Sequence, residues 1–251
     1  MSFGPVAPGR LAFDEDGTPC SPDYGDVYHP RAGAWAQAEH VFLRGNGLPE
    51  RWCGQRRFTV LETGFGLGNN FLATWQAWRV SPRRPARLDF VSIEKHPLSR
   101  DDLAHAHQGR HARDVRPLAD ALLEAWPPLT PDIHTLLFDD GRVRLLLVFA
   151  DVAQALPELV AGVDAFYLDG FAPDRNPQMW DARVLSRLAR LAAPGATVAT
   201  WSVAHDVREG LSAAGFTVER APGFGGKRGM TVGRFTPRHV VAPAPGRRCA
   251  A

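Results

Sequence analysis

Short apolar runs alternate with amphipathic stretches along most of the chain. Apolar runs of strand length occupy residues 58–61, 88–93, 145–149, 165–168 and 197–200. Apolar positions with helical spacing occur in residues 70–79, 98–107, 115–126, 153–160 and 179–191. Strands that alternate with helices in this way indicate a mostly parallel sheet with helices on both faces. The pattern therefore predicts an α/β fold.

Two further pairs of apolar runs flank turns and predict antiparallel hairpins. Residues 136–138 and 143–149 lie on either side of the turn Asp139-Asp140-Gly141. Near the C-terminus, residues 216–219 and 230–235 are separated by the glycine-rich segment 223–229. We expect this second pair to lie at one end of the sheet.

The pattern divides the chain into three parts. Residues 1–50 contain a turn at 14–17, suited to a hairpin, and helical spacing at 32–43. We expect them to form an N-terminal arm that covers the site. Residues 51–236 carry the alternating pattern and form the main domain. The proline-rich segment 237–251 predicts a disordered tail.

Length and charge limit the choice of function mainly by exclusion. With 251 residues and 45% hydrophobic content, the chain is long enough for one sizeable core. A net charge of +2 does not by itself identify a nucleic-acid partner, although Arg56-Arg57 and Arg83-Arg84 are suited to phosphate contact. An arginine-rich solvated surface explains the same residues equally well.

The cysteines and the lack of long apolar segments indicate the compartment. Cys20, Cys53 and Cys249 are an odd number without metal-ligand spacing, so we expect reduced thiols and no metal site. The N-terminus lacks the apolar core of a signal peptide, and no segment approaches the roughly 18 consecutive apolar residues of a membrane span. These features predict a cytoplasmic protein without membrane contact.

The glycine-rich turn after the first apolar run is the strongest ligand-binding motif. It contains Glu62, then Gly64, Gly66 and Gly68, and it leads into a helical stretch. A turn between a strand and a helix brings the backbone close to a nucleotide-like ligand. A dinucleotide fingerprint has the spacing Gly-x-Gly-x-x-Gly, but Asn69 stands where its third glycine would be. The spacing thus favours S-adenosylmethionine (AdoMet) over NAD or FAD.

Acidic residues follow the next two strands, where ligands bind in an open α/β sheet. Glu94 lies 26 residues after Gly68, close to the ~20-residue spacing at which an acid hydrogen-bonds ribose hydroxyls. Asp151 follows the run at 145–149 and is placed to accept the adenine amino group. Each acid taken alone is also compatible with a helix cap. Together with the glycine turn, they outline adenine, ribose and methionine subsites.

Asp169, at the end of the apolar run 165–168, is the candidate for chemistry. It begins the turn Asp169-Gly170-Phe171-Ala172-Pro173, which we expect beside the first strand at the switch point of the sheet. Methyl transfer from a sulfonium requires an aligned lone pair and exclusion of water rather than a nucleophilic side chain. An amine acceptor is protonated at neutral pH, so a carboxylate can orient it and take its proton. The alternative is a turn in which Asp169 only caps the chain.

Short motifs spread over most of the chain together carry a family resemblance. They are Phe13-Asp14, Gly17-Thr18-Pro19, Asp26-Val27-Tyr28, His40-Val41-Phe42-Leu43, the turn at 62–70, Ile93-Glu94-Lys95, residues 168–173 with Asn176-Pro177 and Met179-Trp180, and Gly223-Phe224-Gly225 with Lys227-Arg228. From about Leu11 to Phe235, the chain closely resembles the methyltransferase half of the MnmC family, whose bifunctional members act in the biosynthesis of 5-methylaminomethyl-2-thiouridine in tRNA.

The resemblance implies a fold, a reaction and a set of site residues. The implied fold is that of a class I AdoMet-dependent methyltransferase, Rossmann-like with an antiparallel C-terminal hairpin. The implied reaction methylates 5-aminomethyl-(2-thio)uridine at the tRNA wobble position. Implied AdoMet contacts are Glu62, Gly64, Phe65, Gly66, Gly68, Asn69, Glu94, Lys95, Asp151, Val152 and Asp169, the last of which also acts on the amine. Implied substrate contacts are Asp26, Tyr28, Phe171, Pro173, Lys227 and Arg228.

The chain departs from the bifunctional members at its C-terminal end, where they continue into an FAD-dependent oxidase. We therefore expect no FAD binding. The aminomethyl substrate would come from a separate FAD-dependent oxidase or from a pathway that never adds a carboxymethyl group. Two other interpretations stay open. The first is an aminopropyl or other small-molecule amine transferase similar to spermidine synthase, and the second is a non-catalytic tRNA-binding paralogue. For Lys227 and Arg228, a solvated loop is the alternative to phosphate contact.

Overall fold

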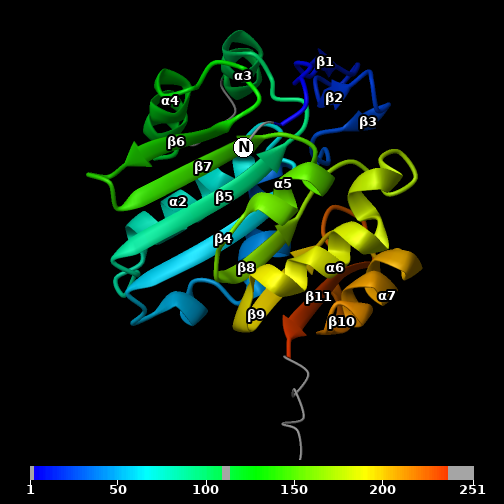
Figure 1. The fold of residues 1–251 in the computed structure, drawn as a ribbon. Coiled ribbons are helices and arrows are strands. Elements are labelled where there is room, and N and C mark those ends of the chain that lie inside the picture. Colours follow the sequence, from blue (N-terminus) through cyan, green and yellow to red (C-terminus); the bar gives the residue numbers. More distant parts are fainter. Residues whose placement is uncertain (1–2, 109–113, 237–251) are drawn as a thin grey trace, which may run out of the picture.

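Eight strands form one mixed sheet in the computed structural model, which describes residues 3–108 and 114–236 (Figure 1). The strand order is β10-β11-β9-β8-β4-β5-β7-β6. The strands are β4 (Arg57–Thr63), β5 (Arg87–Glu94), β6 (Ile133–Phe138), β7 (Val143–Phe149), β8 (Val163–Leu168), β9 (Ala192–Thr200), β10 (Phe216–Pro222) and β11 (Gly229–Phe235). The five predicted core strands pair in parallel. Both predicted hairpins, β6–β7 and β10–β11, are confirmed.

Helices connect the parallel strands as the apolar spacing predicts. They are α2 (Asn69–Val80), α3 (Arg100–His107), α4 (Arg116–Glu124), α5 (Val152–Glu158), α6 (Ala182–Leu191) and α7 (His205–Ala213). The helix predicted at 179–191 is wrong in its first turn, because Asp181 is extended and its side chain accepts the Arg183 N–H at the start of α6. The sequence pattern does not predict α7. Within the described ranges, each helix is too short or too polar to span a bilayer.

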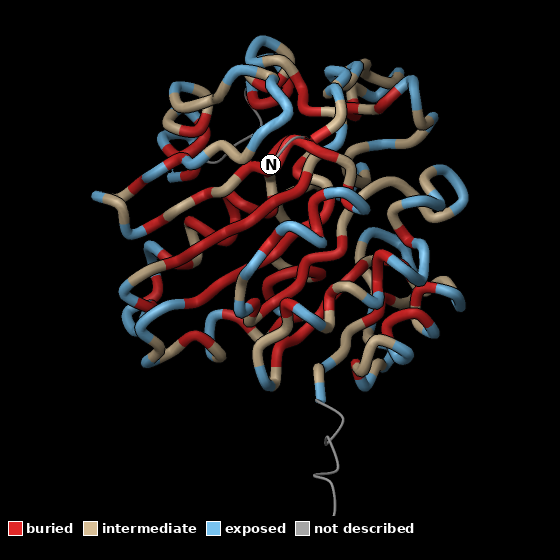
Figure 2. The backbone as a smooth tube through the Cα atoms, in the orientation of Figure 1, coloured by how far each residue is buried: buried red, intermediate tan, exposed pale blue. Residues whose placement is uncertain are grey.

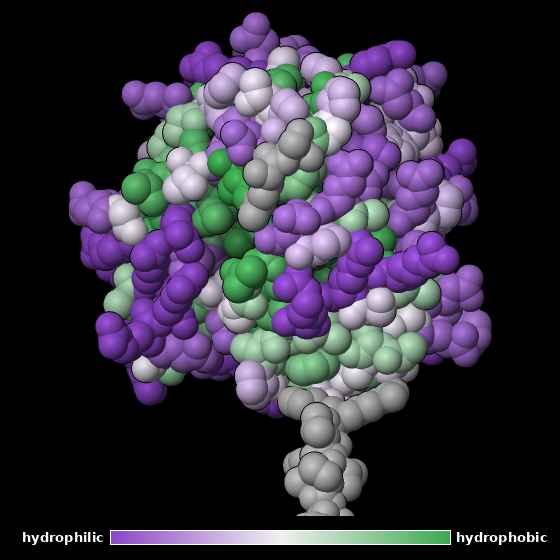
Figure 3. Space-filling model, in the orientation of Figure 1, coloured by the Kyte–Doolittle hydropathy of each residue, from purple (hydrophilic) through white to green (hydrophobic). Residues whose placement is uncertain are grey.

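Each face of the sheet buries its own apolar cluster. Along β4, Phe58 and Val60 pack with α2 and α4, whereas Leu61 packs with α5, α6 and α7 on the opposite face. This alternation follows from the two-residue period of a strand. The central strands are therefore buried along their length (Figure 2). Helices α5 to α7 cover only part of the face seen in Figure 3. Hydrophobic side chains are exposed on the part over β6 and β7 that these helices do not cover.

The N-terminal arm is a small separate sheet followed by irregular helix. Strands β1 (Ala12–Phe13), β2 (Pro19–Ser21) and β3 (Asp26–Val27) are antiparallel, which confirms the hairpin expected around residues 14–17. The helix predicted at 32–43 begins as α1 (Ala34–Gln37) and continues as a wider π-helix at Ala38–Leu43, followed by 3-10 turns at Arg44–Asn46 and Glu50–Trp52. Strands β1 to β3 lie near the carboxyl ends of the parallel strands in Figure 1, whereas the helical segment after them packs into the core under the sheet. The tail expected at 237–251 lies outside the described residues.

Candidate functional site

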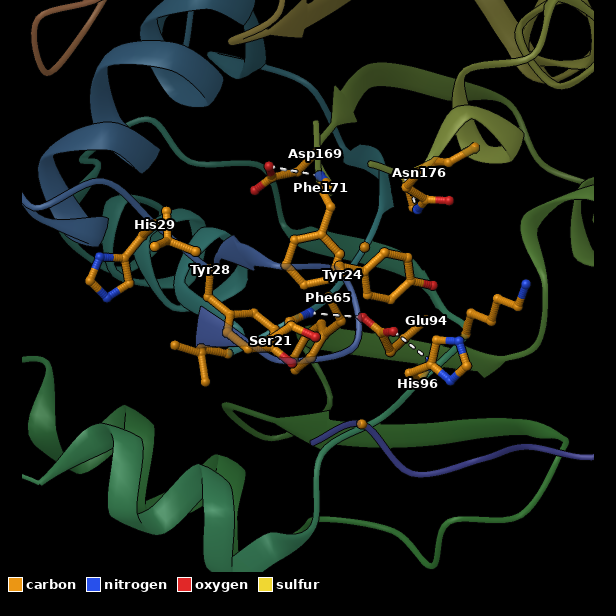
Figure 4. Close-up of a pocket in the computed structure, with 18 of the residues that line it drawn as sticks. Ser21, Tyr24, Tyr28, His29, Phe65, Glu94, His96, Asp169, Phe171 and Asn176 are labelled. Carbon is orange, nitrogen blue, oxygen red and sulfur yellow. Dashed lines mark hydrogen bonds between the residues drawn. The ribbon is translucent and has the colours of Figure 1, made fainter. Parts of the chain in front are cut away.

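A cavity of about 320 Å³ lies at the carboxyl ends of the central strands (Figure 4). Strand β4 has β5 on one side and β8 on the other, so the chain reverses its direction across the sheet at this point. Such a switch point is where open α/β sheets bind ligands. The turn after β4, the end of β5, the turn after β8 and the N-terminal arm all contribute to the cavity wall.

Three glycines shape the turn between β4 and α2. Gly64, Gly66 and Gly68 have φ values of 82°, 52° and 74°, in the left-handed region that favours glycine. A Cβ added to Gly66 would lie 3.3 Å from the Tyr28 ring, and one added to Gly64 would lie 3.2 Å from the Asp169 carbonyl oxygen. The turn is therefore a close-fitting cradle with no room for larger side chains. Its residues in the cavity wall are Gly64, Phe65, Gly66 and Asn69.

The Glu94 carboxylate holds this turn against the end of β5. Its Oε2 accepts a hydrogen bond from the Gly66 N–H at 2.9 Å, and its Oε1 accepts one from the His96 N–H at 2.7 Å. Glu94 and Lys95 both line the cavity. The acid predicted to contact ribose thus reaches the cavity and also fixes the position of the glycine turn.

Three N–H groups donate to the Asp169 carboxylate at the end of β8. Its Oδ1 accepts from the Gly170 backbone at 2.8 Å and from the Trp201 indole at 3.2 Å, and its Oδ2 accepts from the Asn70 amide at 2.8 Å. Burial raises the pKa of Asp169 to about 6, because desolvation outweighs these donors. Asp169 lines the cavity beside the glycine turn. It is therefore placed to accept a proton from a bound group near neutral pH.

Aromatic side chains of the arm close one side of the cavity. The Tyr28 ring meets Phe171 edge to face with centroids 5.3 Å apart, and Tyr24 stacks on the same ring at 4.5 Å. Desolvation raises the pKa of Tyr28, so its hydroxyl stays protonated. Asp26 lies behind this wall and accepts the Ala172 N–H at 2.9 Å. Asp26 thus ties the arm to the turn after β8.

Some predicted ligand residues lie away from the cavity. Asp151 caps α5 by accepting the Ala153 N–H at 2.8 Å, pairs with Lys95 at 3.0 Å, and shares with Val152 a separate cavity of about 20 Å³. This placement corresponds to the helix-cap alternative for Asp151. Of the residues that the structure describes, six other predicted ligand residues are also absent from the wall of the main cavity, which are Glu62, Gly68, Pro173, Asp26, Lys227 and Arg228.

The two basic residues of the β10–β11 loop differ in position. Lys227 Nζ lies 3.5 Å from the centroid of the Trp201 ring, a cation–π contact. The same indole donates to Asp169, and desolvation lowers the pKa of Lys227. Both residues are exposed on the loop, but only Lys227 adjoins the acidic group of the site, through Trp201.

Several residues at the site are not singled out by the sequence, and four of them bear on its chemistry. Tyr24 and His96 line the cavity, Asn70 lines it and also bonds Asp169, and Trp201 bonds Asp169 from outside the wall. Trp201 directly follows the last predicted parallel strand, so the strand-end rule points to it as well. Tyr24 has no comparable signal, because the fold of the arm decides where it lies.

Comparisons with known proteins agree with this geometry. A family model described as S-adenosyl-L-methionine-dependent methyltransferase matches residues 113–236. The chain is 64% identical over 246 residues to the tRNA 5-methylaminomethyl-2-thiouridine biosynthesis bifunctional protein MnmC of Methylibium petroleiphilum. The matched region covers 98% of this chain and 37% of that protein. The chain is 56% identical over 244 residues to the MnmC protein of Aromatoleum aromaticum, covering 96% of this chain and 37% of that protein. The chain thus spans little more than a third of these curated relatives.

Solved structures give the same result. The crystal structure of MNMC2 from Aquifex aeolicus superposes with a TM-score of 0.72 at 25% sequence identity, covering 95% of this chain and 74% of that chain. A spermidine synthase in complex with the transition state analogue AdoDATO superposes with a TM-score of 0.51 at 11% identity, covering 93% of this chain and 73% of that chain. At that identity, the second similarity concerns the fold alone.

Proposed function

We propose that this chain, which is similar over nearly its whole length to the methyltransferase part of the MnmC proteins, methylates the amino group of 5-aminomethyl-(2-thio)uridine at the tRNA wobble position. The observation that carries this proposal is Asp169, a carboxylate beside the glycine cradle at the switch point. Nucleoside mass spectrometry of tRNA incubated with the protein and AdoMet tests it directly.

The predicted class I fold is confirmed by the sheet order and by the structural matches, and we infer that its cavity holds AdoMet. Gly64 and Gly66 line the cavity without a side chain, so their backbone lets the methionine portion approach closely. Glu94 ends β5 at the edge of the same cavity, where ribose hydroxyls bind on this type of fold. The adenine end would then lie toward Tyr24 and His96 rather than Asp151, because these two residues line the cavity.

In methyl transfer at this site, Asp169 accepts the proton that the substrate amine loses. When bound, AdoMet supplies a methyl group whose bond to sulfur breaks, leaving the electron pair on sulfur, as a bond to the amine nitrogen forms. Asp169 attracts the substrate ammonium, orients it and takes the proton that the nitrogen loses. The aromatic wall of Tyr28 and Phe171 excludes water and packs against the uracil ring. The chain needs no nucleophilic side chain for this reaction.

The rate of methyl transfer should depend on the ionisation of Asp169. Only the ionised carboxylate accepts a proton, and its pKa is raised to about 6. We therefore expect kcat/KM to fall about tenfold per pH unit below pH 6. A pH series with saturating AdoMet measures this limb, and titration of the free substrate amine identifies any second limb. A kcat/KM that does not change with pH between about 5 and 7 would exclude the proposed proton transfer to Asp169.

Backbone contacts to tRNA should come from Lys227 and Arg228, while the cavity accepts the wobble base. A loop base can leave its stack at a cost of a few kcal/mol, so modest phosphate contacts are enough. The double variant Lys227→Ala with Arg228→Ala should raise KM for tRNA roughly 3- to 10-fold and weaken its salt dependence. Its affinity for AdoMet should not change.

Kinetics in rising salt measure this effect. Arg220→Ala is the control, because Arg220 is an exposed cation on β10 outside the loop. A fall in kcat at saturating tRNA, without a change in KM, would instead indicate that Lys227 acts on Asp169 through Trp201 and not on tRNA. An unchanged KM and kcat would indicate that the loop is a solvated surface without a role in tRNA binding.

A further inference from the structure

The side chain of Asn70, at the start of α2, joins two carboxyl groups through a single nitrogen. Its Nδ2 donates to Glu62 Oε1 at 2.9 Å and to Asp169 Oδ2 at 2.8 Å. Asn70 is buried but contributes to the cavity wall. One amide thus connects a side chain inside the protein with the acid that faces the ligand cavity.

The two carboxyl groups determine which way the Asn70 amide faces. An amide nitrogen carries two N–H donors, whereas an amide oxygen can only accept, so the nitrogen must point toward two acceptors. Glu62 is fully buried and also accepts the Ser92 hydroxyl at 2.6 Å, which holds it in place. With both N–H groups used, the amide oxygen Oδ1 is the polar atom that Asn70 has left for a ligand. No donor in the described part of the chain bonds this oxygen.

A role as helix cap does not account for this arrangement. Gly68 occupies the N-cap position of α2, and no side chain caps the helix there. The backbone carbonyl of Asn70 already accepts the Thr74 hydroxyl at 2.7 Å. The amide of Asn70 is therefore directed at the two acids rather than at its own helix.

We propose that Asn70 Oδ1 is a second hydrogen-bond acceptor for the substrate amine, and that Glu62 is the positioning residue that fixes its orientation. This inference rests on the function proposed above. The substrate ammonium donates one N–H to Asp169 and another to Asn70. After the proton passes to Asp169, the N–H bound to Asn70 keeps the nitrogen lone pair in line with the methyl carbon. A pair of acceptors in this geometry selects an amine, which has several N–H donors, over a hydroxyl, which has one.

Substitution of Asn70 tests the proposal through kcat and the pH profile. Asn70→Ala should lower kcat for aminomethyl-uridine tRNA about 10- to 100-fold, the usual effect of a lost hydrogen bond to a charged group. Its low-pH limb should move to higher pH, because Asp169 loses an N–H donor that favours the carboxylate. The Kd for AdoMet should stay within about twofold, which also shows that the variant is folded. Asn70→Asp, of the same shape but without the two donors, should lose as much.

Matched measurements separate this role from a structural one. Gln76→Ala lies on the same helix, where Gln76 bonds Asp114 away from the cavity, and it should keep the wild-type kcat and pH profile. A wild-type kcat and low-pH limb in Asn70→Ala would overturn the proposal, as would an equal loss of AdoMet affinity. If the wild-type protein methylates no aminomethyl-uridine tRNA, the proposed function fails first and this inference fails with it.

Discussion

Asp169→Ala is expected to bind AdoMet with nearly wild-type affinity and to lose methyl transfer by roughly 10²- to 10⁴-fold. The carboxylate is assigned to the acceptor amine, not to the cofactor. Its three N–H donors come from the turn after β8, from α2 and from Trp201, so they hold it at the edge of the cavity. Removing it leaves the ammonium without a proton acceptor while the glycine cradle and Glu94 stay in place.

Calorimetry for AdoMet and single-turnover kinetics for tRNA separate the two effects. Asp169→Asn keeps the shape of the side chain and should be as inactive as Asp169→Ala, because an amide does not accept the proton. Asp174→Ala is the control, since the Asp174 side chain is 80% exposed and lies five residues further along the same loop. Transfer at the wild-type rate by Asp169→Ala would exclude the proposed role.

Gly66→Val should abolish AdoMet binding, with a loss of affinity of roughly 100-fold or more. Gly66 has a φ of 52°, which a β-branched residue does not adopt without strain. Its added Cβ would also lie 3.3 Å from the Tyr28 ring, in the space that we assign to the methionine portion. The turn must therefore move, and the Gly66 N–H then loses its hydrogen bond to Glu94.

Titration calorimetry with AdoMet measures this loss, and thermal unfolding checks that the variant is folded. Gly162→Val is the matched control, because a Cβ there meets no atom within 4 Å and its backbone is not left-handed. Wild-type AdoMet affinity in Gly66→Val would place the cofactor elsewhere. Tight FAD binding without AdoMet binding in the wild-type protein would overturn the cofactor assignment altogether.

The sheet and the central site residues follow from local sequence signals. Each parallel strand is a continuous apolar run because both of its faces are buried, so residues such as Val60 and Leu61 identify β4 without knowledge of its neighbours. The ends of these runs locate Glu94 and Asp169, since the carboxyl ends of parallel strands meet at one edge. The turn residues Gly64 and Gly66 are recognisable by spacing alone.

The remaining contacts depend on tertiary packing that no short segment specifies. Asp151 satisfies both the strand-end rule and the helix-cap rule, and the structure places it at the cap. In the sequence, Lys227 lies in a glycine-rich segment, as a solvated loop cation would. In the structure, its ammonium packs on Trp201, which lies 26 residues earlier. The link from Glu62 through Asn70 to Asp169 joins β4, α2 and the turn after β8, and it appears only when the strands have their observed order.

Mass spectrometry of tRNA nucleosides tests the central claim most directly. The substrate is tRNA that carries 5-aminomethyl-uridine or its 2-thio form, incubated with the protein and AdoMet labelled in its methyl group. The account predicts that the labelled methyl group appears on the aminomethyl nitrogen of the wobble nucleoside with wild-type protein and not with Asp169→Ala. Unmethylated nucleoside after incubation with folded, AdoMet-bound wild-type protein would contradict it.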